Sequence, residues 1–317
     1  PARRWPRASA ASRQRHRQGH PRFPGQGLRL RNDRFAGARP ARLAAVVGDR
    51  SPAADRGDVR RQHDEAARDE ADKDILEEKP LSVATGRSLD EIAEDETNPG
   101  PITSMLAEVA RRQRCYVTAP VITKRDGRYY NSSILLNREG KIDGVFHKVR
   151  PTATEIVPKT YYKGGGITPG EINAPVFDTD FGKVGMQICA DASWEENWLA
   201  LKKNGAEMVL FPSQGPYSNT LTNHAWVNHY YIVSATGEDA RIIDMTGDVI
   251  ASDGEFARWV CAPVNLEKVF LHIWPQTLKF KDIQKKYGRK VRFHVYHKEN
   301  WATLESLDAD VKVLDIL

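Results

Sequence analysis

The chain of 317 residues has few cysteines and no long apolar run. Its three cysteines, Cys115, Cys189 and Cys261, are odd in number and lack C-x-x-C spacing. They argue against a disulfide framework and a zinc site, so we expect no metal and a reducing, cytoplasmic location. No stretch approaches the roughly 18 uninterrupted apolar residues of a membrane-spanning helix, and the start lacks the apolar core of a signal peptide.

Lysine and glutamate are both absent from residues 1–60, so the charge is divided unevenly along the chain. That segment carries 15 arginines against four aspartates, a net charge of +11, whereas the remainder has 32 basic and 38 acidic side chains, a net charge of −6. An opening rich in arginine and proline is typical of a nucleic-acid-binding arm, a disordered leader or out-of-frame translation of GC-rich DNA. Because few aromatic side chains are available for stacking on bases, we expect no nucleic-acid partner, and we assign residues 1–40 to a leader that is disordered or not native.

One cysteine lies where a predicted strand runs into a predicted helix. An apolar run, V-G-M-Q-I, leads into Cys189, and an amphipathic stretch follows that begins with acidic side chains and ends with lysines before Gly205. At a helix N-terminus the free backbone N–H groups and the helix dipole favour a thiolate over a thiol. Most buried cysteines are inert, so this feature alone leaves a structural role open.

A β-hairpin is predicted upstream of the cysteine. Strand Tyr130–Asn137, a turn, and strand Lys141–His147 lead into Lys148 and then Glu155. A lysine at a strand end is usually a solvated surface charge. Further upstream, Glu78 closes a short apolar run.

Together these segments resemble the nitrilase superfamily of carbon–nitrogen hydrolases, whose members use a Glu–Lys–Cys triad. The sequence matches the family at G-V-F-H-K-V-R-P-T around Lys148 and at V-G-M-Q-I-C-A-D around Cys189. Glu155, seven positions after the lysine, matches a further glutamate that many members carry. At Glu78 the family's preceding proline is replaced by Glu77. Glu78 is the expected catalytic base, and the alternatives are Glu77 or neither residue.

The resemblance implies a role for each of these residues. Cys189 supplies the nucleophilic sulfur, and Glu78 carries the thiol proton to the leaving ammonia. Lys148 and the backbone N–H of Ala190 stabilise the tetrahedral intermediate. Glu155 pairs with the buried lysine and positions the hydrolytic water.

Periodicity alone predicts only a mixed α/β fold with many short strands. The resemblance implies a four-layer α-β-β-α sandwich over residues 41–270, forming a homo-oligomer (a dimer or larger), with an extension over 271–317 that packs on a partner subunit. The predicted helices are Gly57–Ala71, Ile102–Arg112 and Leu221–Asn228, and the predicted strands include Ala41–Val47, Cys115–Ile122, Val176–Asp178, Glu207–Phe211, Tyr230–Ala235, Arg258–Val264 and Val291–Tyr296. The basic stretch Lys279–Lys290 is expected only as a solvated charged surface.

The implied function is a cofactor-free hydrolase of a small-molecule amide or N-carbamoyl substrate that releases ammonia and a carboxylic acid. Amides are favoured over nitriles because Ala190 and Asp191 follow the cysteine, where nitrilases tend to have tryptophan and glutamate. The lysine loop K-V-R-P-T-x-x-E resembles the nitrilase version, so nitrile hydrolysis stays an alternative. A second alternative is a non-catalytic member that has lost the triad at Glu78.

Overall fold

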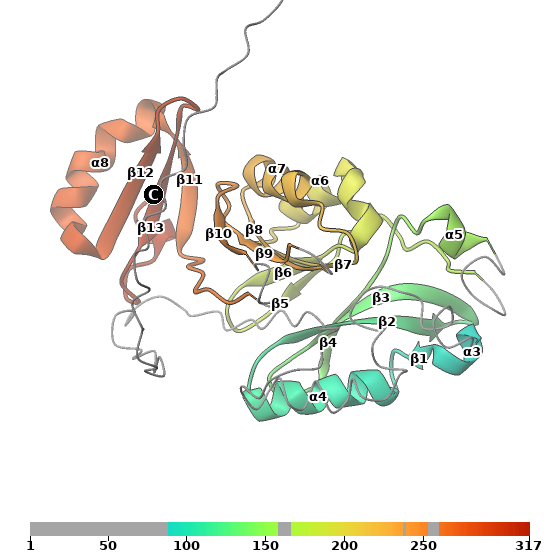
Figure 1. The fold of residues 1–317 in the computed structure, drawn as a ribbon. Helices are drawn as coiled ribbons and strands as arrows, with labels where there is room; N and C mark the ends of the chain where they lie inside the picture. Colours follow the sequence, from blue (N-terminus) through green and yellow to red (C-terminus); the bar gives the residue numbers. More distant parts are fainter. Residues whose placement is uncertain (1–87, 158–165, 237–238, 253–259) are drawn as a thin grey trace, which may run out of the picture. The chain divides into compact units, whose positions relative to one another are not determined.

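A computed structural model of the chain describes residues 88–157, 166–236, 239–252 and 260–317 (Figure 1). The expected strand Ala41–Val47, the expected helix Gly57–Ala71 and the two candidate bases Glu77 and Glu78 lie outside these residues. Within the described part of the chain, none of the helices combines the length and the apolar character needed to cross a membrane.

The first half of the described chain forms a four-stranded sheet in the order β1-β2-β3-β4. Strands β1 and β2 are parallel, and the other neighbours are antiparallel. Helix α4 begins at Pro101, whose fixed φ suits the first helical position, and its apolar side packs on one face of the sheet. The elements are α3 (Leu89–Ile92), β1 (Glu94–Asp95), α4 (Pro101–Gln113), β2 (Val117–Arg125), β3 (Arg128–Leu136), β4 (Ile142–His147) and α5 (Ala153–Ile156).

A second, six-stranded sheet has the order β10-β9-β8-β7-β6-β5. Strands β6, β7 and β8 are parallel, and every residue of β7 is buried, as expected for a central strand covered on both faces. Apolar side chains of α6 and α7 pack on one face of this sheet. The elements are β5 (Val176–Asp178), β6 (Lys183–Met186), the 3₁₀ turn η1 (Cys189–Ser193), α6 (Glu195–Lys203), β7 (Met208–Ser213), α7 (Ser218–Asn228), β8 (Tyr231–Thr236), β9 (Arg241–Ile243) and β10 (Val249–Ser252).

The two sheets face each other through one apolar core. Leu135 and Phe146 of the first sheet pack in the same buried cluster as Met186, Leu210 and Val233 of the second. Burying a side chain of this size contributes about 1.5–3 kcal/mol, so this cluster holds the two sheets together. With α4 outside one sheet and α6 and α7 outside the other, the layers run α-β-β-α, which confirms the predicted sandwich.

The C-terminal residues form a small antiparallel sheet with its own apolar core. The order is β11-β13-β12, built from β11 (Lys268–His272), α8 (Ile273–Tyr287), η2 (Gly288–Lys290), β12 (Val291–Tyr296), β13 (Trp301–Ser306) and η3 (Val313–Asp315). Phe270 of β11 stacks on His229 at 4.1 Å and meets Trp226 edge-on, so the sheet contacts the end of α7 in the same chain. That this extension also packs on a partner subunit stays a prediction.

One expectation about the C-terminal part of the chain needs correction. Residues 261–264 are not a strand, although Arg258–Val264 is predicted as one. Pro263 is the last but one residue of that run and cannot donate a ladder hydrogen bond. The basic side chains of the stretch Lys279–Lys290 are exposed, as expected of a solvated charged surface. Most of this stretch belongs to helix α8, whose Phe280, Ile283 and Tyr287 recur at helical spacing and pack in the C-terminal core.

Candidate active site

Cys189 lies at the first position of η1, just after strand β6. The strand's pairing continues one residue further, because Gln187 donates its N–H to the carbonyl of Leu210 at 3.1 Å. Cys189 has a φ of +46°, in the left-handed region that a non-glycine residue rarely adopts. The sharp turn that this conformation makes carries the half-buried thiol out of the sheet.

The helix expected to start at Cys189 starts later. Trp194 is extended, with φ −126° and ψ +112°, and α6 begins only at Glu195. The two glutamates of its first turn and the two lysines of its last turn are placed as predicted. The thiol therefore sits at a 3₁₀ turn rather than at the N-terminus of α6, so the dipole of that helix does little to favour a thiolate at Cys189.

Lys148 and Glu155 form a buried ion pair. The lysine side chain is 1% exposed, and its Nζ lies 3.0 Å from Glu155 Oε2 and 3.3 Å from Oε1. Asn131 Nδ2 donates to Oε1 at 2.9 Å, and the N–H of Thr152 donates to Oε2 at 2.6 Å. Burial raises the pKa of Glu155, but the charge of Lys148 and these hydrogen bonds outweigh it, so that the pKa lies below its usual value. Glu155 is therefore ionised near neutral pH.

The loop that carries the lysine is fixed by its backbone. Lys148 donates its N–H to the carbonyl of Asn131 at 2.8 Å, and its own carbonyl accepts from the N–H of Gly170 at 2.8 Å. A Cβ at Gly170 would lie 2.4 Å from the carbonyl oxygen of His147, so a side chain there would displace one of the two segments. Lys148 is thus held at the end of β4 by strand β3 on one side and the 168–170 segment on the other.

Tyr217 is a neighbour of the cysteine that the sequence analysis did not identify. Its hydroxyl lies 3.9 Å from Cys189 Sγ, at the limit of a weak sulfur hydrogen bond. It immediately precedes α7 with a φ of +49° and packs edge-on against Phe211 of β7. The signal in the sequence is the segment P-S-Q-G-P-Y, which begins with the last two residues of β7, because residues at the carboxyl ends of parallel strands gather at one sheet edge.

Asp191 connects the cysteine turn to the lysine loop. Its Oδ1 accepts the N–H of Arg150 at 2.7 Å, and its Oδ2 accepts the N–H of Ile188 at 3.1 Å. Burial raises the pKa of this carboxyl to about 6, although hydrogen bonds from Ile188 and Arg150 and the charge of Lys148 act in the opposite direction. Through Arg150 and Ile188, this carboxyl joins the backbone beside Lys148 to the backbone beside Cys189.

Two aromatic side chains hold the backbone of the same turn. The indole N–H of Trp198 donates to the carbonyl of Asp191 at 2.9 Å, and Nε2 of His224 donates to that of Ala192 at 2.8 Å. The two rings stack at 4.2 Å and nearly parallel. Burial lowers the pKa of His224, so the ring is neutral and serves as a fixed donor.

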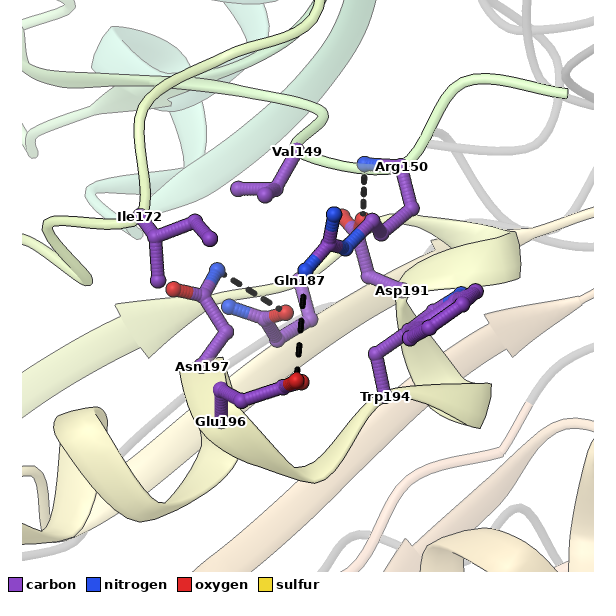
Figure 2. A pocket seen from close by; sticks show the side chains of 8 residues that line it. All are labelled: Val149, Arg150, Ile172, Gln187, Asp191, Trp194, Glu196 and Asn197. Carbon is purple, nitrogen blue, oxygen red and sulfur yellow. Dashed lines mark hydrogen bonds and ion pairs between the residues drawn. The ribbon is translucent and has the colours of Figure 1, made fainter.

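Figure 2 shows the narrow hollow where the lysine loop meets the turn and α6. The guanidinium of Arg150 lies 4.7 Å from the ring of Trp194, and one of its nitrogens lies 4.0 Å from Glu196. Asn197 Nδ2 donates to Gln187 Oε1 at 3.3 Å in the same hollow. The hollow has no room for a water-sized sphere, so it is a packed junction rather than a ligand site. The residues around it are Val149, Arg150, Ile172, Gln187, Asp191, Trp194, Glu196 and Asn197.

The described residues thus bring together two of the predicted site residues directly. Lys148 and Glu155 are in contact, Cys189 lies in the turn that Asp191 joins to their loop, and Ala190 follows the cysteine within η1. Glu78, like Glu77, lies outside the described residues.

Comparisons with known proteins add a family and several relatives. The family model described as carbon-nitrogen hydrolase matches residues 70–269. The chain is 31% identical over 147 residues to beta-ureidopropionase from Arabidopsis thaliana, covering 43% of this chain and 35% of that protein. It is 28% identical over 148 residues to a chloroplastic omega-amidase from the same plant, covering 44% and 40%.

The chain therefore matches well under half the length of these two curated relatives. Among solved structures, a carbon-nitrogen hydrolase from Helicobacter pylori G27 is 20% identical with a TM-score of 0.46, covering 52% of this chain and 67% of that one.

Proposed function

Because the chain belongs to the carbon–nitrogen hydrolase family of the nitrilase superfamily, we propose that it hydrolyses an amide or N-carbamoyl C–N bond through a cysteine thioester. With water as the second reactant, an amide gives ammonia and a carboxylic acid, and an N-carbamoyl substrate gives ammonia, carbon dioxide and an amine. The observation that carries this proposal is the buried pair Lys148–Glu155 next to the turn of Cys189. An ammonium with 1% exposure is costly to bury for stability alone, but it is useful where negative charge develops on a substrate.

Each residue of the proposed site has one task. The thiolate of Cys189 attacks the carbonyl carbon, and the ammonium of Lys148, with the N–H of Ala190, receives the oxyanion. Glu155 keeps Lys148 charged and points its Nζ in one direction, since both carboxylate oxygens lie within 3.3 Å. Glu78 is our proposal for the group that takes the thiol proton and gives it to the leaving ammonia, with Glu77 as the alternative.

The names of the relatives support the substrate class. A ureido group is an N-carbamoyl amine, and an amidase acts on an amide, so both names point to a carbonyl carbon bonded to nitrogen. The lysine loop with its V-R-P-T-x-x-E sequence is the observation that favours a nitrile instead.

We further expect the protein to act in the cytoplasm as a homo-oligomer.

The test is ammonia release from a panel of matched amides, N-carbamoyl amino acids and nitriles. Cys189→Ala should lower the rate at least about 1,000-fold, because the nucleophile is lost. Cys261→Ala, which removes an exposed thiol elsewhere, is the matched control and should leave the rate unchanged. Rates insensitive to Cys189→Ala would refute the proposal, and a higher rate on a nitrile than on its matching amide would favour the nitrilase alternative.

A further inference from the structure

Asp191 is a buried acidic side chain that the proposed chemistry does not use. It is 1% exposed and belongs to the same 3₁₀ turn as the nucleophile. Its two carboxylate oxygens accept two backbone N–H groups that lie far apart in the sequence, one from Arg150 and one from Ile188. Arg150 is two residues after Lys148, and Ile188 is one residue before Cys189.

Local turn structure accounts for one of these hydrogen bonds and leaves the other unexplained. The bond from Ile188 spans three residues. Asp191 is the third residue of η1, and it accepts the N–H of the residue just before this turn, as an acidic side chain in the first turn of a helix can. The bond to Arg150 spans 41 residues and, at 2.7 Å, is the shorter of the two. The local turn uses one carboxylate oxygen of Asp191. The second oxygen, which accepts the N–H of Arg150, serves the connection to the lysine loop.

Burial makes this arrangement costly for the fold. A carboxylate removed from water is stabilised only by the groups that donate to it, and here these are backbone N–H groups together with the nearby charge of Lys148. A neutral side chain would cap the turn without that cost. The charge therefore indicates a requirement for strong, fixed acceptors at the junction of the two segments.

We propose that Asp191 is a positioning residue that sets the place of Lys148 relative to Cys189. It does so because its one carboxylate accepts a backbone N–H beside each of them, from Arg150 near Lys148 and from Ile188 next to Cys189. This inference rests on the proposed hydrolase function, in which the ammonium must meet the oxyanion formed at the attacked carbon. A misplacement of about 1 Å in such a site costs on the order of 100-fold in rate.

The remaining contacts of the turn explain why the effect is on position rather than on folding. Trp198 and His224 hold the carbonyls of Asp191 and Ala192, which fixes the turn to α6 and α7. Hydrogen bonds from Asn131 and Gly170 fix the lysine loop to its own neighbours. Loss of the Asp191 carboxylate thus leaves each segment supported while loosening the connection between them.

The experiment compares Asp191→Asn with the unmodified full-length chain. The amide keeps the shape of the side chain but turns an NH₂ group toward one of the two N–H donors. We expect kcat on the best amide to fall about 100-fold while KM changes less than about threefold, because the misplaced ammonium acts on the oxyanion of the transition state rather than on the bound substrate. Asp178→Asn, which removes an exposed aspartate of β5 paired with Lys183, is the matched control and should leave both values unchanged.

Hydrogen exchange gives a second measurement that needs no substrate. In Asp191→Asn, peptides covering 149–152 and 186–190 should both exchange faster, and the peptide covering β7 should not change. A smaller variant, Asp191→Ser, supplies the same measurements if the asparagine variant does not fold.

Four outcomes are distinguishable. A drop in kcat with faster exchange in both segments supports the proposal. An unchanged kcat overturns it, as does a drop in kcat with unchanged exchange. If the unmodified chain shows no turnover that depends on Cys189, the proposed function fails. The positioning role of Asp191 in catalysis then fails with it. Hydrogen exchange in that case reports only whether Asp191 joins the two backbone segments.

Discussion

The buried carboxyl of Asp191 makes a pH-dependent contribution to stability whose sign is unusual for an aspartate. Its pKa rises from 3.8 to about 6 on folding, chiefly through burial. A difference of this size corresponds to about 3 kcal/mol. Because the folded pKa is the higher one, this stabilisation is fully present below pH 3.8 and is lost as the pH rises through about 6.

Replacing Asp191 with asparagine removes this pH dependence. The difference in free energy of unfolding between Asp191→Asn and the unmodified chain should therefore change by about 2 kcal/mol in favour of the variant as the pH rises from about 4.5 to 7.5. This is the part of the roughly 3 kcal/mol that falls within this pH range. Urea unfolding followed by tryptophan fluorescence at four or five pH values measures this difference directly. Two curves that stay parallel across the window would refute the reasoning, since they would mean that Asp191 has the same pKa in the folded and unfolded chains.

Three further predictions concern the same region. Glu155→Gln removes the charge 3.0 Å from Lys148, so the free energy of unfolding at neutral pH should fall by about 3 kcal/mol. Because the pKa of Glu155 is lowered on folding, this loss of stability should become smaller as the pH falls below the pKa of Glu155 in the unfolded chain. The pH dependence is opposite in sign to that of Asp191, and a loss that grows in acid would contradict the prediction. Trp198→Phe removes the indole donor to the Asp191 carbonyl and should cost about 1 kcal/mol in urea unfolding, whereas a neutral effect would mean that the donor is replaced by water. Gly170→Ala brings a methyl group against the backbone at the end of β4 and should cost about 1–3 kcal/mol, with ammonia release reduced as the lysine loop shifts; full activity would show that the loop adapts.

The sequence predicts those parts of the site that local pattern encodes. Lys148 follows a hairpin strand and Cys189 follows a buried strand, and both are found there, because strand ends are set by periodicity of two and by the turns between them. Helix α4 is likewise predicted from its proline and its apolar spacing, and its observed bounds differ from those predicted by one residue at each end. In each case the signal lies within about a dozen neighbouring residues.

Features that depend on contacts between distant segments are harder to predict. The positive φ of Cys189 and the extended conformation of Trp194 lie between β6 and α6, and no single residue type predicts them. Asn131 looks like any polar residue of a strand until its amide is seen to donate to Glu155. Helix α8 is different, because Phe280 and its apolar neighbours recur at helical spacing in the sequence. A prediction that considers the charge of the surrounding lysines before this spacing misses the helix.

Asp191 shows how one residue can carry both kinds of information. Its place two positions after the cysteine is visible in the sequence as part of V-G-M-Q-I-C-A-D, and a short-range pattern of this kind is readily attributed to the chemistry of the thiol. In the structure, one carboxylate oxygen serves the local turn and the other reaches Arg150, 41 residues away. A carboxylate is suited to this double task because it offers two acceptor oxygens in a fixed geometry, which neither serine nor alanine does. The position of Asp191 two residues after Cys189 therefore serves the connection between two segments of the fold as well as the proposed reaction.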